Sequence, residues 1–144
     1  MEITANAVQE VTVGSNVIFT DTSVPGNCSI IHREGSGLVK LRGLTSCQCR
    51  ARFKVYFSGN IAIPTAGTVG AISLAISVDG EPINTTRMIV TPAAVDEYFN
   101  VSSSIYLDVP VGCCSTVGVV AGAENPATTS INVQNANLIV ERVA

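Results

Sequence analysis

The sequence predicts a single all-β domain, a jelly-roll β-sandwich, and three observations support this fold class. Short segments of alternating apolar and polar residues recur along the chain and are separated by turn residues. The 144 residues suit one domain with its own core, and they show no repeat, linker or low-complexity stretch. Only 13% of the residues are charged and 47% are hydrophobic, yet the apolar runs are too short to span a membrane. The low charge favours an oligomer that covers part of its surface.

The two clearest strands lie between residues 51 and 83. Odd-numbered residues from Ala51 to Phe57 form one apolar face, and the even-numbered residues beside them are mostly polar. A second strand over 71–78 alternates in the same way, with its aliphatic side chains at even positions and alanine or serine at odd ones. In both strands we expect one face in the core and the other against water or a partner. Asp79-Gly80 then predicts a tight hairpin turn.

The rest of the chain reads as further strands and loops. The N-terminal segment 1–14 contains a short alternating run and ends at a turn, so we place the jelly-roll domain at 15–144. The other predicted elements are strands at 17–20, 29–32, 37–41, 82–90, 98–109, 116–121 and 131–143, loops at 21–27, 60–70 and 122–128, a turn at 43–46 and one helical turn at 91–97.

The charge pattern excludes some partners. A net charge of −3 argues against nucleic-acid binding, which needs a basic face. We see no export signal and therefore expect synthesis in a cytoplasm, with no membrane partner. The basic residues cluster in one part of the chain: Arg33, Lys40, Arg42, Arg50, Arg52 and Lys54. This cluster predicts either a solvated strand face or a site for an anionic ligand or an acidic subunit.

Five cysteines are present: Cys28, Cys47, Cys49, Cys113 and Cys114. An odd number without an export signal indicates reduced thiols. The C-x-C and C-C spacings do not match a structural zinc site, so we expect no metal and interpret the cysteines as small buried hydrophobic residues. Disulfides formed later in an oxidising setting remain an alternative.

The sequence contains no catalytic constellation that we can identify. His32 is the only histidine, and no G-x-S-x-G motif accompanies it. The carboxylates are scattered, and there is neither a P-loop nor a dinucleotide-binding fingerprint. We therefore expect a protein that is not an enzyme, with no catalytic residue and no cofactor.

Three segments carry a resemblance to a known family. The run TAGTVGAISLAISVDGEPI (65–83) resembles the central strands of C1q/TNF-like jelly rolls, and VPVG (109–112) and VQNANLIVER (133–142) resemble the last strands. The likeness spans residues 50–144 and is closest to bacterial and phage members: C-terminal domains of spore-surface glycoproteins, and phage head-fibre or capsid-decoration proteins. The chain lacks a Gly-X-Y collagen stalk, which favours a free-standing virion protein.

This resemblance implies a compact homotrimer. Tyr56, Tyr98 and Tyr106 lie off the core faces and are candidates for its interface, because aromatic residues are enriched at interfaces. The expected function is structural: decoration of a particle surface, above all a phage capsid, with synthesis in a bacterial cytoplasm and 1–14 as the anchor. The alternative is a trimeric module on a bacterial spore or cell surface that binds a receptor or glycan through the loops at 21–27, 60–70 and 122–128.

Overall fold

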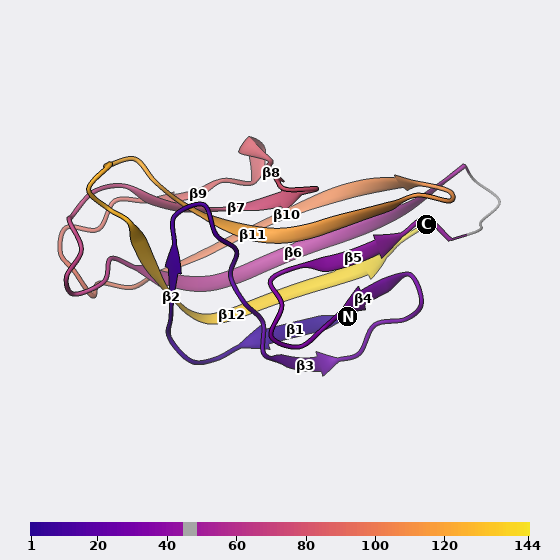
Figure 1. Cartoon of the computed structure of the whole chain (residues 1–144), viewed down its shortest axis with the longest axis horizontal. Coiled ribbons are helices and arrows are strands. Elements are labelled where there is room, and N and C mark those ends of the chain that lie inside the picture. Colours follow the sequence, from indigo (N-terminus) through magenta and orange to yellow (C-terminus); the bar gives the residue numbers. More distant parts are fainter. Residues whose placement is uncertain (45–48) are drawn as a thin grey trace.

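The computed structural model describes residues 1–44 and 49–144, which form two antiparallel β-sheets packed face to face (Figure 1). Sheet A contains β1 (Glu2–Ala5), β2 (Gln9–Thr12), β3 (Asp21–Val24), β6 (Arg50–Ala62), β10 (Phe99–Pro110) and β12 (Ser130–Arg142). Sheet B contains β4 (Ile30–His32), β5 (Val39–Arg42), β7 (Ile72–Val78), β8 (Glu81–Pro82), β9 (Met88–Val90) and β11 (Cys114–Ala123). The predicted all-β sandwich is confirmed.

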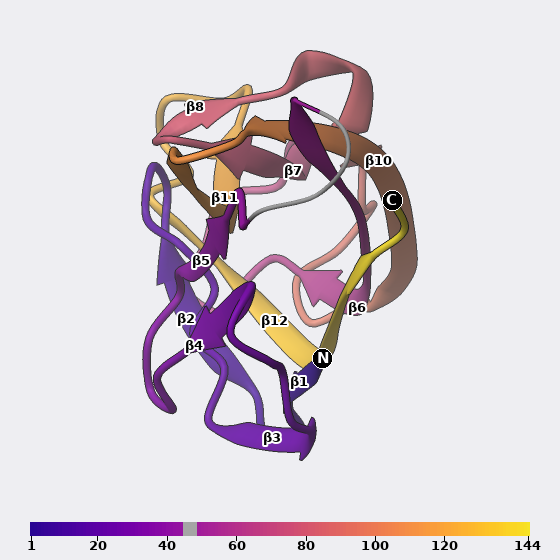
Figure 2. The same cartoon turned by 90° about the vertical axis from the view of Figure 1, so that its right-hand side faces the viewer.

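Four long strands set the shape of the molecule. In Figure 1, β6, β10, β11 and β12 run along its long axis, and Figure 2 looks along them from the end that carries the C-terminus. The order in sheet A is β10-β6-β12-β1-β3, with β2 also paired to β12. Sheet B has the order β4-β5-β11-β7-β8, with β9 also paired to β7. Among the described strands, β10 pairs only with β6, so it forms an edge of sheet A.

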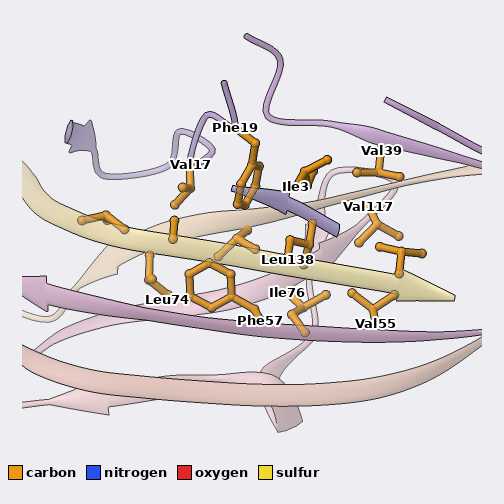
Figure 3. Close-up of a cluster of buried hydrophobic side chains, with 14 of the residues drawn as sticks. Ile3, Val17, Phe19, Val39, Val55, Phe57, Leu74, Ile76, Val117 and Leu138 are labelled. Atoms are coloured by element: carbon orange, nitrogen blue, oxygen red, sulfur yellow. The ribbon is translucent and has the colours of Figure 1, made fainter. Parts of the chain in front are cut away.

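The core lies between the two sheets and follows the predicted alternation. The odd-numbered residues of β6 from Ala51 to Phe57 are fully buried, as are Leu74 and Ile76 of β7. Figure 3 shows Phe57 and Leu138 of sheet A beside Leu74 and Ile76 of sheet B. Apolar burial of this kind contributes roughly 25 cal/mol per Å² and dominates folding.

The other side of β7 departs from the prediction. Ser73, Ala75 and Ser77 were expected to face water or a partner, but all three are buried. Strand β7 has neighbours on both edges, and the segment around Asn16 packs against the adjacent strand β11, where a Cβ on Gly118 would meet Asn16 Oδ1 at 2.9 Å. Val13, Pro82 and Arg87 border the same shallow hollow as Ser73 and Ala75, so other segments of the chain lie beside this face of β7.

The N-terminal segment is part of the sandwich. β1 pairs with both β12 and β3, and β2 pairs with β12. Ile3 and Val11 are buried, and the Met1 ammonium donates a hydrogen bond to the Val140 carbonyl oxygen at 2.7 Å. No structural boundary therefore falls at Gly14, and the role of 1–14 as an anchor stays a prediction.

The predictions of a strand at 17–20 and of a loop at 21–27 were both wrong. Residues 17–20 form no strand, although Val17 and Phe19 are buried as expected, while Asp21–Val24 forms β3 within the predicted loop. The side-chain amide of Gln9 donates to the Ile18 carbonyl oxygen at 2.8 Å and accepts from the Ile18 N–H at 2.9 Å. The Gln9 side chain therefore satisfies the backbone N–H and carbonyl oxygen of Ile18, which a neighbouring strand would satisfy if 17–20 were itself a strand.

The predicted hairpin turn is confirmed, but the return strand is interrupted. Asp79 and Gly80 both have positive φ, 52° and 86°, as a tight hairpin requires. The predicted strand 82–90 is divided into β8, the 3₁₀ turn η1 (Asn84–Thr86) and β9. The buried Thr86 hydroxyl accepts the Ile76 N–H at 2.9 Å and so replaces a backbone partner of β7.

Two further predictions need correction. β6 continues to Ala62, so the crossing loop begins after the predicted start at residue 60. The segment 91–97 contains no helix: Asp96 has a φ of 57° and its N–H donates to the Ile63 carbonyl oxygen at 2.8 Å. This contact ties a turn to the end of the crossing connection. The turn predicted at 43–46 lies partly outside the described residues.

Candidate functional site

The outer face of sheet A is the side turned away from the core. It is formed by alternate residues of four neighbouring strands, and the register of those strands places them side by side. Its members are Glu2 and Thr4 of β1; Arg52, Lys54, Tyr56, Ser58 and Asn60 of β6; Asn100, Ser102, Ser104, Tyr106 and Asp108 of β10; and Gln134, Asn137, Ile139 and Glu141 of β12. All of them are half-buried or exposed in the single chain.

One half of this face carries ion pairs. Arg52 lies directly opposite Asp108 across β6 and β10, and it donates from Nε to Oδ1 at 2.8 Å and from Nη2 to Oδ2 at 3.1 Å. Arg50 Nε lies 3.2 Å from Asp108 Oδ2. The hydrogen bond from Arg52 lowers the pKa of Asp108 below its ordinary value, and the charge of Arg50 adds to this. The same bond raises the pKa of Arg52.

These pairs are exposed, so they contribute more to order than to stability. The side chains of Arg52 and Asp108 are 41% and 38% accessible, and ion pairs in such positions are screened by water and salt. A two-pronged contact does fix the direction of both side chains. Shallow hollows lie on either side of Asp108, one bordered by Arg50 and Pro110 and the other by Arg52 and Tyr106.

The three candidate tyrosines do not form one group. Tyr56 and Tyr106 lie on the outer face of sheet A in neighbouring strands, because Tyr56 is opposite Ser104 in the register. Tyr106 is the most exposed large hydrophobic residue described, at 62%. Tyr98 precedes β10 and lies eight positions from Tyr106, roughly 27 Å along an extended chain. The structure therefore brings Tyr56 and Tyr106 together and leaves Tyr98 at the far end, while their role as interface residues stays a prediction.

The other half of the face is polar but nearly uncharged. Asn100 Nδ2 donates to Asn60 Oδ1 at 3.1 Å, and Asn137 Nδ2 donates to Glu2 Oε2 at 2.9 Å. Asn137 Oδ1 is buried and has no hydrogen-bond partner among the described residues. Amide and hydroxyl side chains therefore dominate this half of the face.

The edge strand β10 borders this face, and among the described strands only β6 pairs with it. It is 12 residues long, and Asp108 is its one charged residue. Ile105 and Leu107 point toward the core side but are only partly buried, and they pack against the core cluster. Natural edge strands are blunted by lysine, proline, bulges or shortness, and an open, long edge is a surface for association.

The predicted basic cluster is divided between the two sheets. Arg50, Arg52 and Lys54 belong to β6 of sheet A, where Arg50 and Arg52 pair with Asp108 of the same chain. In sheet B, Arg33 directly follows β4, and β5 contains Lys40 and Arg42. The six residues therefore form no single basic patch for an anionic ligand.

The interpretation of the cysteines as buried residues was wrong for those that the structure describes. Cys28, Cys49, Cys113 and Cys114 are all free and exposed. Cys113 lies in the β10–β11 turn, Cys114 begins β11, Cys49 precedes β6, and Cys28 lies between β3 and β4. Figure 1 shows the end of β10, the start of β11 and the C-terminus at the same end of the sandwich. Two contacts link them to this end: Val111 N–H donates to the Cys49 carbonyl oxygen at 3.0 Å, and Gly43 N–H to that of Cys113 at 2.9 Å. Cys47 lies outside the described residues.

His32 has a structural setting. Its Nε2 lies 2.9 Å from the Ser36 carbonyl oxygen, and its ring packs edge-on against Phe19 with centroids 6.4 Å apart. Within residues 1–44 and 49–144, no three His, Cys, Asp or Glu side chains are placed to share a metal ion. The same part of the chain has no helix with the length and hydrophobicity needed to cross a bilayer.

Sequence reasoning missed the part that Asp108 plays on this face. The alternation of 98–109 placed Asp108 and Tyr106 on one side, and the alternation of 51–58 did the same for Arg52 and Tyr56. The pairing of these two strands joins the sets, and single-strand patterns do not specify which strands pair. The available signal was opposite charge at the ends of the two alternating segments: Arg52 near the start of 51–58, and Asp108 near the end of 98–109.

Comparisons with known proteins agree on the fold. No family model matches the chain, and no curated protein matches it. The globular domain of a zebrafish complement 1qA protein is similar at 12% identity and a TM-score of 0.59, covering 96% of this chain and 93% of that one. Murine APRIL is similar at 12% identity and a TM-score of 0.52, covering 95% and 96%.

A third solved structure has a lower score. The C-terminal domain of EclA, described as a sugar-binding protein, aligns at 14% identity with a TM-score of 0.43, covering 95% of this chain and 79% of that one. This score is too low to carry an argument. The two higher-scoring structures and the arrangement of two antiparallel sheets lead to one conclusion: the protein has the jelly-roll fold of C1q/TNF-like domains.

Proposed function

We propose that the protein is a non-enzymatic structural jelly roll that assembles as a homotrimer and decorates the surface of a particle, most specifically a phage capsid. The observation that carries self-assembly is that β10 is an edge strand and also bears Tyr106, which is exposed on the outer face of sheet A. An unpaired strand edge of this length with a single charged residue promotes association between chains, and a defined contact with another copy prevents uncontrolled aggregation.

The outer face of sheet A has the composition of such a contact. Tyr56 and Tyr106 supply large area with polar tips, and Ile139 lies beside Tyr56 in the register. Arg52 and Asp108 satisfy one another within the chain, so their burial against a second copy leaves neither charge unpaired. The low charged fraction of the chain as a whole favours an oligomer, although this face itself carries five charged residues: Glu2, Arg52, Lys54, Asp108 and Glu141.

Three copies and a particle are inferred from resemblance rather than from geometry. The 65–83 and 133–142 segments resemble bacterial and phage C1q/TNF-like domains, for which a trimer is expected. In a cyclic trimer the copies are equivalent, and one surface of each meets a different surface of the next. The edge of β10 and the outer face of sheet A are such a pair of adjacent, unlike surfaces.

Substitution of Tyr106 tests the surface. Tyr106→Glu adds a charge in the centre of the proposed contact, and we expect the mass in solution to fall from three chains to one at micromolar concentration. Ile31→Glu is a matched control, because Ile31 is also a large exposed residue, at 44%, but lies in β4 of sheet B. Loss of assembly in both variants, or in neither, would contradict the assignment to sheet A.

The particle is tested separately. Gradient-purified particles from lysed source cells are analysed by quantitative mass spectrometry for this chain. We expect it in the particle fraction at a fixed ratio to the major capsid protein. Recovery only in the unsedimented fraction would overturn the decoration role while leaving the trimer intact.

A second candidate function is a module that binds a receptor or glycan. The structure brings two of the three predicted loops together: Thr128 Oγ1 donates to the Thr68 carbonyl oxygen at 2.8 Å, and Asn125 Nδ2 to that of Val69 at 3.4 Å. The third loop contains β3, in sheet A, and shares no such contact with them. A glycan array probes this joint loop surface, and binding abolished by Asn125→Ala would favour the module over pure decoration.

A further inference from the structure

The shallow hollow beside Ser73 and Ala75 lies on the outer face of sheet B and has no part in the proposed assembly, which uses sheet A. Its floor is formed by β7 and β11, where Ser73 pairs with Gly122 and Ala75 with Val120 in the register. Gly14 borders it beyond β11, where its N–H bonds the strand, and the hairpin to β8 borders it beyond β7. Segments from four parts of the chain therefore enclose a volume of about 270 Å³.

Ser73 brings to this hollow a buried hydroxyl without a partner. Among the described residues five polar ones are buried, and three of these have side-chain hydrogen bonds: Ser29, Thr86 and Thr128. Ser73 and Ser77 have none within the described part of the chain, and of the two only Ser73 borders the hollow. Ser73 is 6% exposed, and a Cβ at Gly122 would lie 2.9 Å from its Oγ. A buried hydroxyl without a partner costs free energy, which a ligand group in the hollow would recover.

Arg87 supplies the one charge that borders the hollow among the described residues. It lies between η1 and β9, and its Nη2 donates to the neutral Asn84 Oδ1 at 3.1 Å, which leaves its other N–H groups to water or a ligand. No carboxylate in the described part of the chain lies within ion-pair distance of Arg87, and Glu81 of the adjoining hairpin does not border the hollow. The planar fork of a guanidinium matches a carboxylate, so the hollow has the donor set for one.

We infer that this hollow binds a sugar acid, that is, a ring-sized carbohydrate unit that carries a carboxylate. Arg87 holds the carboxylate. A simple carboxylate would leave Ser73 without a partner, whereas a sugar acid places a ring hydroxyl beside its carboxylate and satisfies both side chains. Ala75, Pro82 and Val120 offer aliphatic contact to the C–H groups of the ring. The volume is below the roughly 300–1,000 Å³ of pockets for drug-sized ligands, which limits the ligand in the hollow to one such unit.

This site differs from the joint loop surface of the second candidate function. Gly122 begins the predicted loop 122–128, but the structure places it in β11, at the floor of the hollow. The outer face of sheet B stays accessible when the outer face of sheet A is covered. The inference therefore requires neither the trimer nor the particle.

The experiment titrates the ¹⁵N-labelled full chain with sodium glucuronate and follows backbone amide and arginine Nε–H signals by TROSY NMR. The signals of Gly80, Gly122 and Arg87 should move and saturate, whereas equal concentrations of glucose or sodium chloride should leave them in place. Sodium acetate, which has the carboxylate without the ring, should bind about tenfold more weakly. Absence of a saturable shift at these residues, or equal affinities for acetate and glucuronate, would overturn the inference.

Two substitutions test the two polar contacts separately. Arg87→Gln should weaken glucuronate binding by about tenfold or more, and Arg33→Gln is the matched control, because Arg33 is also exposed and lies outside the hollow. Ser73→Ala should weaken binding by about threefold without lowering the Tm, since its hydroxyl has no partner within the described residues. A lowered Tm for Ser73→Ala would reveal a structural role, and equal losses in the two arginine variants would reveal unspecific charge attraction; either result would contradict the site.

The loop variant distinguishes this site from the earlier candidate. Asn125→Ala should leave glucuronate binding unchanged, because Asn125 does not border the hollow. Loss of binding in Asn125→Ala, with Arg87→Gln unaffected, would assign the ligand to the joint loop surface and overturn the inference. A single-chain mass in solution together with saturable glucuronate shifts would refute the proposed trimer and support the site.

Discussion

Arg52 and Asp108 face each other across β6 and β10 and are joined by two hydrogen bonds of 2.8 and 3.1 Å. This contact fixes the direction of both side chains at the charged end of the outer face of sheet A, where β10 pairs only with β6 among the described strands. Arg50 also pairs with Asp108, so the group presented to any second copy that covers this face contains two arginines and one aspartate. The proposed contact therefore covers an aspartate whose charge is already paired within its own chain.

The Arg52–Asp108 pair gives a pH prediction. The pKa of Asp108 is lowered in the folded state, chiefly by the hydrogen bond from Arg52. A lowered pKa contributes stability that is present above the unfolded-state pKa and is lost as the pH falls through the folded-state pKa. The natural chain should thus have a higher Tm than Asp108→Asn at neutral pH, with the difference closing below the ordinary aspartate range.

Thermal melts of both proteins between neutral pH and strong acid check this expectation. High salt should reduce the difference at neutral pH, since the pair is exposed. Asp21→Asn serves as the control, because Asp21 is also an exposed aspartate on a strand of sheet A. A difference that grows on acidification would show that the sign is wrong.

The amide of Gln9 gives a prediction about stability. Its two hydrogen bonds to Ile18 hold the segment 16–20 against sheet A, although this segment forms no strand. Gln9→Ala should lower the free energy of unfolding by about 1 kcal/mol, as measured by urea titration. Gln9→Glu retains the acceptor but loses the donor, so its free energy of unfolding should also be lower than that of the natural chain. An unchanged midpoint in both variants would show that water replaces the amide without cost.

The buried hydroxyl of Thr86 gives a larger expected effect. Thr86→Val keeps the shape but leaves the Ile76 N–H without its partner at 2.9 Å, which should cost about 1–3 kcal/mol. Thr86→Ser keeps the hydroxyl, which also donates to the Ile83 carbonyl oxygen at 2.7 Å, and should be the milder change. Denaturant unfolding of the two variants separates hydrogen bonding from packing, and a more severe loss in Thr86→Ser would contradict this account.

The alternation of single strands predicted much of this fold, because burial of one face imposes a period of two on the sequence. β6, β10, the Asp79–Gly80 turn and the core face of β12 follow directly from that pattern. The patterns do not encode side chains that replace backbone partners. Gln9 stands in for a strand beside Ile18, and Thr86 interrupts the return strand, so the limits of these elements were wrong.

The candidate site was predicted only in part for a related reason. Tyr56 and Tyr106 were recognisable as residues off the core, and Tyr98 was selected by the same criterion although it lies at the other end of β10. Strand pairing decides which of these residues are neighbours, and that information is tertiary. Exposure of the cysteines was also not predictable, because their small apolar side chains fit a core equally well.

The mass of the natural chain in solution tests the central claim most directly. Light scattering in the presence of reductant should give close to three times 14.9 kDa across a micromolar concentration series. Reductant removes any contribution of disulfides, so the result reports the sheet A contact alone. A mass of a single chain over the whole series would contradict the assembly, and a mass of two chains would retain the surface but refute the trimer.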